Sequence, residues 1–265
     1  MLKRGVMTLA NIRFLIRERR KLLSILGTAA AAVLILWTVN SPTIIGASAT
    51  QRQLPIYCVE RDDKKIAISF DAAWGNEDTG TLINILSSYG IHTTFFVVGD
   101  WAEKYPDSVK ALHEAGHEVM SHSSHHDHFS MMSANEIAAD LQEANRKIAA
   151  STGIEPTLIR CPYGEHDDHV IQTVSSQGMT AIQWSVDSLD WKGISADEIY
   201  ERVIKRVESG SIVLFHNAAE HTPEALPRIL EWLQSKGYTV VPVSELLLDG
   251  PTSIDHAGKQ IPLAS

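Results

Sequence analysis

Residues 66–75 have the sequence IAISFDAAWG, in which an apolar run over 66–70 ends at an aspartate, Asp71. A short run of this kind, rich in β-branched and aromatic residues, predicts a buried strand. Patterns of helical period follow it, so strands and helices are expected to alternate over residues 64–248. Six further runs of the same type lie at 93–98, 118–121, 157–160, 179–184, 211–216 and 238–242.

Repeated alternation of strands and helices requires parallel strands joined by crossover helices. Two of the helical stretches begin with a capping-box pattern, Ser133-Ala-Asn-Glu136 and Ser195-Ala-Asp-Glu198. Residues 64–248 are too few for eight strand–helix units, so the sequence predicts an α/β fold of the distorted, incompletely closed (β/α)7 barrel type. Residues 249–265 show no period and are predicted to form a loose tail.

The charge of the chain is unevenly distributed. The whole chain has 23 basic and 32 acidic residues and a net charge of −9, yet residues 1–49 carry seven basic residues against one acidic residue, Glu18. The remainder is therefore strongly acidic and lacks the basic surface that contacts phosphates. No nucleic-acid partner is expected.

No charged side chain occurs over residues 22–51, and basic residues precede this stretch on its amino side. Its apolar part is about as long as a bilayer is thick. The sequence therefore predicts a cytoplasmic basic segment over 1–21, a transmembrane anchor or signal over 22–40 and a linker over 41–63. The predicted domain then lies outside the cytoplasm at the cell membrane. Ala47-Ser-Ala49 resembles a signal-peptidase site, so a secreted form cut near Ala49 is the alternative.

Polar side chains follow five of the predicted strands at the point where each strand ends. Because the carboxyl ends of parallel strands meet at one face of an α/β fold, we expect these side chains to converge there. They are Asp71, His122, His126, Arg160, Asp187, Asp190 and His216. A polar site is therefore predicted at this face.

Two histidine pairs are candidates for metal binding. His122 and His126 stand four residues apart after a predicted strand, a spacing that suits two ligands of a tetrahedral metal. His113 and His117, with the intervening glutamate, match the HExxH pattern of zinc peptidases, which needs both histidines on one helix. Gly116 is expected to end that helix, so the second pair should diverge and a metallopeptidase is disfavoured.

Five motifs, in this order, resemble those of the NodB-homology polysaccharide deacetylases, carbohydrate esterase family 4. They are SFDAAWG at 69–75, HSSHH at 122–126, RCPYG at 160–164, DSLDW at 187–191 and LFH at 214–216. The first motif and the apolar N-terminal segment are also similar to those of sporulation-type deacetylases of Gram-positive bacteria. The resemblance implies a metal-dependent hydrolase that removes N-acetyl groups from a cell-wall glycan, peptidoglycan or a chitin-like polymer, and releases acetate.

The resemblance also implies roles for the charged residues. Asp71 would be the general base, and Arg160 would keep its carboxylate ionised and oriented. His216 would protonate the departing amine, and Asp190 would raise the pKa of its imidazole.

Further roles implied by the resemblance concern the substrate and the metal. The backbone N–H of Tyr163 would stabilise the tetrahedral oxyanion. Trp191 and Leu214 would wall the pocket for the acetyl methyl group. A divalent metal, most often zinc in this family, would be held by His122 and His126 and would polarise the acetamido carbonyl.

The first motif departs from the family, whose members mostly carry two adjacent aspartates there. In this chain Asp71 is followed by Ala72, which cannot bind a metal. The third ligand is then water or an oxygen of Asn76, Glu77 or Asp78. The same departure supports a second hypothesis, a catalytically impaired deacetylase fold that acts as a glycan-binding or spore-envelope protein.

Overall fold

A computed structural model describes residues 9–39 and 52–263. The chain divides into two compact units, residues 1–51 and 52–265. In the first unit, Leu9–Val39 forms one helix, α1. No helix within the described ranges is both long and apolar enough to cross a membrane. The anchor predicted over 22–40 is not supported by this finding, and residues 40–51 of the predicted anchor and linker lie outside the described ranges.

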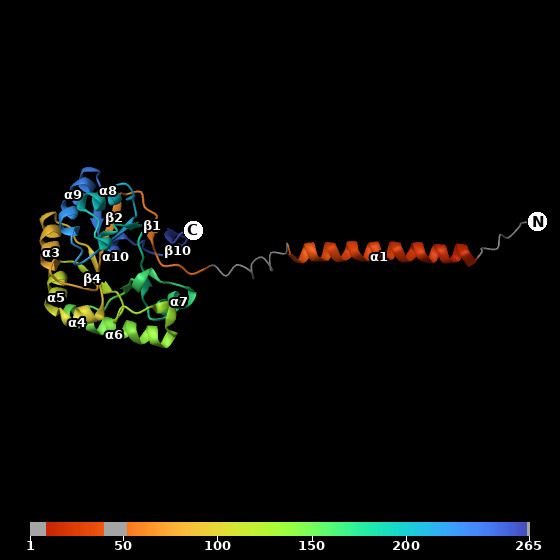
Figure 1. The fold of residues 1–265 in the computed structure, drawn as a ribbon, viewed down its shortest axis with the longest axis horizontal. Coiled ribbons are helices and arrows are strands. Elements are labelled where there is room, and N and C mark those ends of the chain that lie inside the picture. Colours follow the sequence, from red (N-terminus) through yellow and green to blue (C-terminus); the bar gives the residue numbers. More distant parts are fainter. Residues whose placement is uncertain (1–8, 40–51, 264–265) are drawn as a thin grey trace, which may run out of the picture. The chain divides into compact units, whose positions relative to one another are not determined.

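In the second unit, strands occupy the centre and helices surround them (Figure 1). The strands are β1 Cys58–Val59, β2 Lys65–Ala72, β3 Thr94–Val97, β4 Glu118–Ser121, β5 Leu158–Ile159, β6 Thr180–Ala181, β7 Val186–Asp187, β8 Ile212–His216, β9 Thr239–Val241, β10 Thr252–Ile254 and β11 Lys259–Pro262. The helices are α3 Thr79–Ser88, α4 Gly99–Lys104, α5 Pro106–Glu114, α6 Ala134–Thr152, α7 Asp168–Ser176, α8 Ala196–Ile204, α9 Thr222–Ser235 and α10 Val243–Leu246. Short 3₁₀ turns are η1 Phe129–Met131, η2 Pro162–Gly164 and η3 Asp190–Lys192.

The main sheet is parallel and curled, with the strand order β6-β5-β4-β3-β2-β8-β7, and β9 pairs with β2. Strands β6 and β7 follow one another along the chain but lie at opposite ends of this order, so the sheet stays open between them. Residue Ile56 bridges Ile182 beside this opening, and the Val59 N–H donates to the Gly210 carbonyl oxygen at 2.9 Å. The predicted open α/β barrel is thus confirmed at the level of a curled parallel sheet covered by helices.

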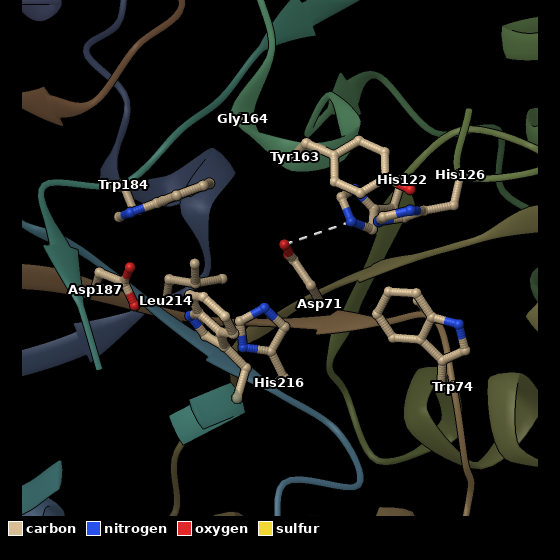
Figure 2. Close-up of a pocket in the computed structure, with 12 residues that line it drawn as sticks. Asp71, Trp74, His122, His126, Tyr163, Gly164, Trp184, Asp187, Leu214 and His216 are labelled. Atoms are coloured by element: carbon tan, nitrogen blue, oxygen red, sulfur yellow. Dashed lines mark ion pairs between the residues drawn. The ribbon is translucent and has the colours of Figure 1, made fainter. Parts of the chain in front are cut away.

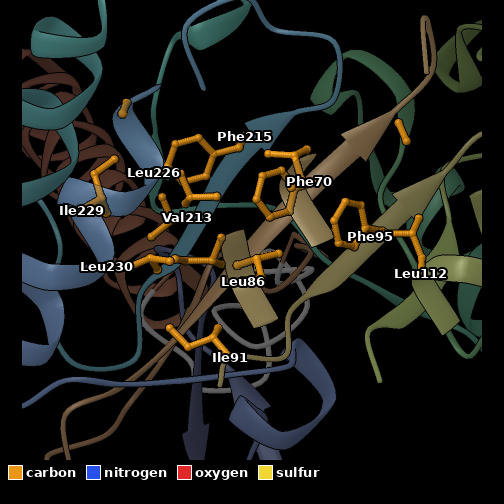
Figure 3. Close-up of a cluster of buried hydrophobic side chains, with 14 of the residues drawn as sticks. Phe70, Leu86, Ile91, Phe95, Leu112, Val213, Phe215, Leu226, Ile229 and Leu230 are labelled. Atoms are coloured by element: carbon orange, nitrogen blue, oxygen red, sulfur yellow. The ribbon is translucent and has the colours of Figure 1, made fainter. Parts of the chain in front are cut away.

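Strand β2 positions the site because one of its faces packs in the hydrophobic core and the other carries Asp71, a polar side chain of the pocket. On one face, Phe70 lies in the main hydrophobic core, where its ring stacks on Phe95 and Phe215 at centroid distances of 4.7 and 5.6 Å (Figure 3). Burying such a side chain contributes about 1.5–3 kcal/mol. Side chains alternate along a strand, so Ser69 and Asp71 face the opposite side. The core thereby fixes where Asp71 lies.

Two predictions about the helices are confirmed. Helices α6 and α8 both begin with a complete capping box, at Ser133 and Ser195. In the HExxH stretch, His113 lies in α5, whereas His117 follows its end and places Nδ1 3.2 Å from the backbone nitrogen of Thr93. The two histidines therefore do not share a helical face, as Gly116 predicted.

Predictions about both ends of the domain need correction. Residues 52–63, assigned to a linker, belong to the compact unit and include β1. Residues 249–265, assigned to a loose tail, contain β10 and β11, which form a three-stranded sheet with β1. These strands are short and pair with residues far away in the sequence. No local period marks them, which is why the pattern missed them.

Candidate active site

A pocket of about 380 Å³ opens at the carboxyl ends of the parallel strands (Figure 2). It is lined by Asp71, Ala73, Trp74, His122, His126, Tyr163, Gly164, Trp184, Asp187, Trp191, Leu214 and His216. Most of the predicted site residues are therefore brought together. Arg160 and Asp190 do not line the pocket, but each is buried and bonded to a residue that does.

Asp71 and Arg160 form a buried ion pair. The guanidinium Nη1 donates to Asp71 Oδ1 at 2.7 Å, and Nη2 donates to Ser69 Oγ at 2.8 Å and to the Gln183 carbonyl oxygen at 3.2 Å. Arg160 is completely buried, with its guanidinium 4.2 Å from the centroid of the Phe96 ring. One carboxylate oxygen is thus fixed, while the second, Oδ2, lies 3.5 Å from His122 Nε2.

The surroundings of Asp71 decide its charge. Burial by itself raises the pKa of this carboxyl group, but the positive charges of Arg160, His122 and His216 and the hydrogen bond from Arg160 together outweigh burial, so the pKa is lowered. Asp71 is therefore an ionised carboxylate at neutral pH. Its free oxygen can accept a proton from a water molecule in the pocket.

His216 and Asp190 form a second pair on the neighbouring strand, where His216 lies in register with Asp71. His216 Nδ1 lies 2.8 Å from Asp190 Oδ1, and the backbone N–H of His216 donates to Asp190 Oδ2 at 2.8 Å. Thr222 Oγ1 and the Trp191 N–H also donate to this carboxylate. Burial lowers the pKa of the His216 imidazole, but the hydrogen bond and charge of Asp190, together with the charge of Asp71, outweigh burial, so the pKa is raised.

His122 and His126 lie on the other side of Asp71 from His216 (Figure 2). Their ring centroids are 4.9 Å apart. Burial lowers the pKa of both imidazoles, that of His126 to about 4, so both are neutral near pH 7. His122 Nδ1 lies 2.6 Å from the Arg160 carbonyl oxygen, which leaves Nε2 to face the pocket. Neutral imidazoles with a free nitrogen are suitable ligands for a divalent metal.

The loop that carries the two histidines is held from both sides. Ser123 Oγ accepts the His126 N–H at 2.8 Å, and Asp140 Oδ1 of α6 accepts the Ser124 N–H at 2.9 Å. The carbonyl oxygens of Ser123 and Ser124 accept N–H groups from the first residues of α4. The contacts of the loop with Asp140 and with α4 therefore help to position both rings.

None of the side chains proposed from the sequence as a third metal ligand points into the pocket. Asn76 Oδ1 accepts from Ser108 Oγ, and Glu77 Oε2 accepts the Asn76 N–H. Asp78 Oδ2 accepts the Ala218 N–H at 2.9 Å. In residues 9–39 and 52–263, no group of three or more histidine, cysteine, aspartate or glutamate side chains is arranged to hold a metal ion. The described residues therefore offer a metal two imidazole ligands and no third ligating side chain.

Backbone strain is concentrated around the pocket. Tyr163, between Pro162 and Gly164, has a φ of +59°. A left-handed conformation costs a non-glycine residue roughly 1–2 kcal/mol. Such residues cluster at functional sites. The others near the pocket are Ser123, His126, Leu189 and Ala218.

Several contributors to the site were not predicted from the sequence. Ser69 Oγ accepts a hydrogen bond from Arg160, and Thr222 Oγ1 donates one to Asp190. The centroid of the Trp184 ring lies 5.6 Å from the Arg160 guanidinium. Ser69 could have been found, because it lies two residues before Asp71 on the same face of a strand. Thr222 and Trp184 could not, since their contacts depend on how distant segments pack.

A base and an acid that face one pocket from neighbouring strands are what the hydrolysis of an amide or ester requires. The fold and the site together resemble those of α/β-barrel hydrolases. Comparison with known proteins narrows this class. A family model described as Polysaccharide deacetylase matches residues 59–182.

Individual relatives agree with the family model. The uncharacterized protein YlxY of Bacillus subtilis is 28% identical over 193 residues, covering 73% of this chain and 60% of that protein. Peptidoglycan-N-acetylglucosamine deacetylase PgdA of Listeria monocytogenes is 33% identical over 186 residues, covering 70% of this chain and 39% of that protein. The crystal structure of a CE4 family pseudoenzyme from Bacillus anthracis has 33% identity and a TM-score of 0.70, covering 73% of this chain and 68% of that chain.

The chain therefore belongs to the polysaccharide deacetylases, carbohydrate esterase family 4, as its motifs predicted. It spans less than two thirds of the length of YlxY and of PgdA. A mutant of the Bacillus anthracis pseudoenzyme, with restored enzymatic activity, matches at 34% identity and a TM-score of 0.71. The relatives thus include proteins named as deacetylases and one described as a pseudoenzyme.

Proposed function

We propose that this chain removes N-acetyl groups from a cell-wall glycan, with release of acetate. The observation that carries this proposal is the ionised carboxylate of Asp71, which Arg160 fixes by one oxygen while the other faces the pocket. His216, on the neighbouring strand, supplies a proton donor to the same pocket. The aromatic and apolar lining suits a sugar ring and an acetyl group.

The residues of the chain would divide the reaction as follows. Asp71 takes a proton from water as the water oxygen bonds to the acetamido carbonyl carbon. The Tyr163 N–H donates to the carbonyl oxygen as it becomes negatively charged. The carbon–nitrogen bond then breaks as His216 gives its proton to the nitrogen, so the products are acetate and a free amine. A divalent metal, zinc by family resemblance, would be held by His122 and His126 and would polarise the carbonyl when bound.

Acetate release should depend on pH through His216 and His126. His216 must be protonated to act, and its pKa is raised, so activity should persist above pH 6.5 and fall as pH passes the pKa in the folded protein. On the acid side, metal binding should be lost near the His126 pKa of about 4. In Asp190→Asn the alkaline limb should move to lower pH, because the charge that raises the pKa is gone.

The His216–Asp190 pair should also make the stability of the folded protein depend on pH. A histidine whose pKa is raised by folding stabilises the folded state below its unfolded pKa, and this stabilisation is lost as pH rises through the folded pKa. Thermal unfolding followed alongside the rate profile checks both effects. An alkaline limb that stays in place in Asp190→Asn would show that His216 is not the titrating acid.

The proposed reaction is tested directly by its products. The purified chain is incubated with N-acetylglucosamine oligomers and with peptidoglycan, and acetate and new amino groups are both measured. We expect equal amounts of the two products, and loss of both when a chelator removes divalent metal. Release of reducing ends or of peptides instead of acetate would point to a different hydrolase.

A second candidate function, a glycan-binding protein with an impaired site, is favoured by one observation. Ala72 replaces the second aspartate of the family motif, and it is buried in the core beside Phe70, outside the pocket lining. Binding of peptidoglycan without any release of acetate would establish this alternative. Against it stand the two bonded pairs, which a site with no catalytic role would not need.

We also propose that the domain lies outside the cytoplasm. The basic residues up to Lys21, followed by an uncharged stretch to Gln51, support export of the domain from the cytoplasm to the cell surface, either anchored in the cell membrane or released by cleavage near Ala49. Protease added to intact protoplasts tests this. Digestion of the domain is expected, and protection would place it in the cytoplasm.

A further inference from the structure

Exposed aromatic side chains are distributed unevenly over the domain. In residues 52–263, six large hydrophobic side chains are exposed, and three of them are aromatic: Trp74 at 66%, Tyr163 at 57% and Trp191 at 56%. All three line the same pocket. Exposing large apolar rings to water is unfavourable, and a cluster of them around a pocket indicates a surface that a ligand covers.

Trp74 is held in place although its side chain is exposed. Its neighbour Gly75 has a φ of +61°, and the Gly75 carbonyl oxygen accepts from Trp101 Nε1 at 2.6 Å and from Asn217 Nδ2 at 3.0 Å. A Cβ at position 75 would lie 2.5 Å from the Ala218 Cβ, so the loop is packed closely here. The fold thus fixes the backbone beside an exposed tryptophan at the rim of the pocket.

Trp74 and Tyr163 lie on two sides of His126 (Figure 2). Their ring centroids are 5.0 and 4.6 Å from that of His126, both in edge-on arrangements. Tyr163 also stacks on His128 at 4.1 Å with an interplanar angle of 11°. The two exposed rings therefore adjoin His126, which lies beside the carboxylate of Asp71, and extend the surface outward from the point where the acetamide would react.

We propose that Trp74 is a stacking platform for a second sugar ring, next to the one whose acetamido group reaches Asp71. This inference rests on the proposed deacetylase function. One face of a pyranose carries C–H groups and can lie flat on an indole ring, whereas its hydroxyl groups stay in water. A ligand with several linked N-acetylhexosamine rings uses this platform, and a monosaccharide in the pocket does not. Trp74 is thus a determinant of chain-length preference.

The test compares substrates of increasing length. Rates of acetate release from N-acetylglucosamine and from its tetramer are measured for the wild-type chain, Trp74→Ala and Trp74→Phe. In Trp74→Ala we expect the tetramer-to-monomer ratio of kcat/KM to fall about three- to tenfold, through KM, as loss of one aromatic contact implies. Trp74→Phe should retain most of the preference. Ile154→Ala, which removes an exposed side chain outside the pocket, is the matched control.

Two results overturn the platform: an unchanged ratio in Trp74→Ala, or an equal loss on monomer and tetramer. If no protein releases acetate from any substrate, the deacetylase function fails, and the dissociation constant of the tetramer, measured by calorimetry, decides the platform on its own. Binding weakened in Trp74→Ala and retained in Trp74→Phe supports it even then. Equal binding by all variants contradicts it.

Discussion

Replacing Asp71 with asparagine is expected to lower acetate release by roughly 100- to 10,000-fold, the range that loss of a general base produces. Asparagine keeps the shape of the side chain but accepts no proton from water. It also leaves the buried guanidinium of Arg160 without its anionic partner. Removing one member of a buried ion pair costs about 3–5 kcal/mol of stability, so Asp71→Asn should also unfold at a lower temperature.

The two effects are separated by measuring kcat well below the unfolding temperature of the variant. Asp62→Asn, which changes an exposed aspartate outside the pocket, is the matched control and should retain both activity and stability. Retention of wild-type kcat by a folded Asp71→Asn protein would remove Asp71 from the reaction. It would also favour a function that uses the pocket for binding alone.

The second large effect is expected for His122→Ala. This variant loses one of the two imidazoles that can bind a metal near Asp71, so both bound zinc and acetate release should drop, the latter by at least about 100-fold, since even residues behind a metal ligand contribute 10- to 100-fold. His125→Ala is a close control because His125 is exposed and pairs with Asp100 and Glu143 outside the pocket. Zinc content by mass spectrometry and acetate by enzymatic assay are measured on the same samples.

The paired measurement distinguishes two explanations of a lost activity. If His122→Ala loses activity but keeps full zinc content, the histidine acts on Asp71 through their 3.5 Å contact and does not bind the ion. Equal losses in His122→Ala and His125→Ala would indicate general damage to the 122–126 loop. Only loss of both zinc and activity confined to His122→Ala agrees with the proposed site.

The central sheet could be predicted from the sequence because its strands are short, apolar and separated by helices with clear signals. The run before Asp71 appears as β2, and the capping boxes mark the starts of α6 and α8. Strand β7 was missed because Val186–Asp187 is only two residues long and its pairing with β8 comes from tertiary packing. The local hydrophobic pattern of the sequence carries no information on such a pairing.

The candidate site was predictable for a related reason. Residues at the carboxyl ends of parallel strands converge whatever the details of the helices, so Asp71, His122, Arg160 and His216 could be grouped from sequence positions alone. The direction of the side chains in the segment 76–78, after the first strand, could not be predicted in this way. The segment 76–78 turns away from the pocket because its side chains bond to Ser108, to Ala218 and within the loop itself, and these contacts depend on how α5 and the end of β8 pack.

The proposed reaction depends most on a divalent cation bound by the two imidazoles beside the Asp71 carboxylate. A crystal of the domain grown with zinc, with diffraction recorded on both sides of the zinc absorption edge, locates this ion without reference to activity. We expect an anomalous difference peak in contact with His122 Nε2 and the His126 ring, next to Asp71. A zinc-saturated crystal with no peak there, or with its ion held at His113 or His117, would contradict it.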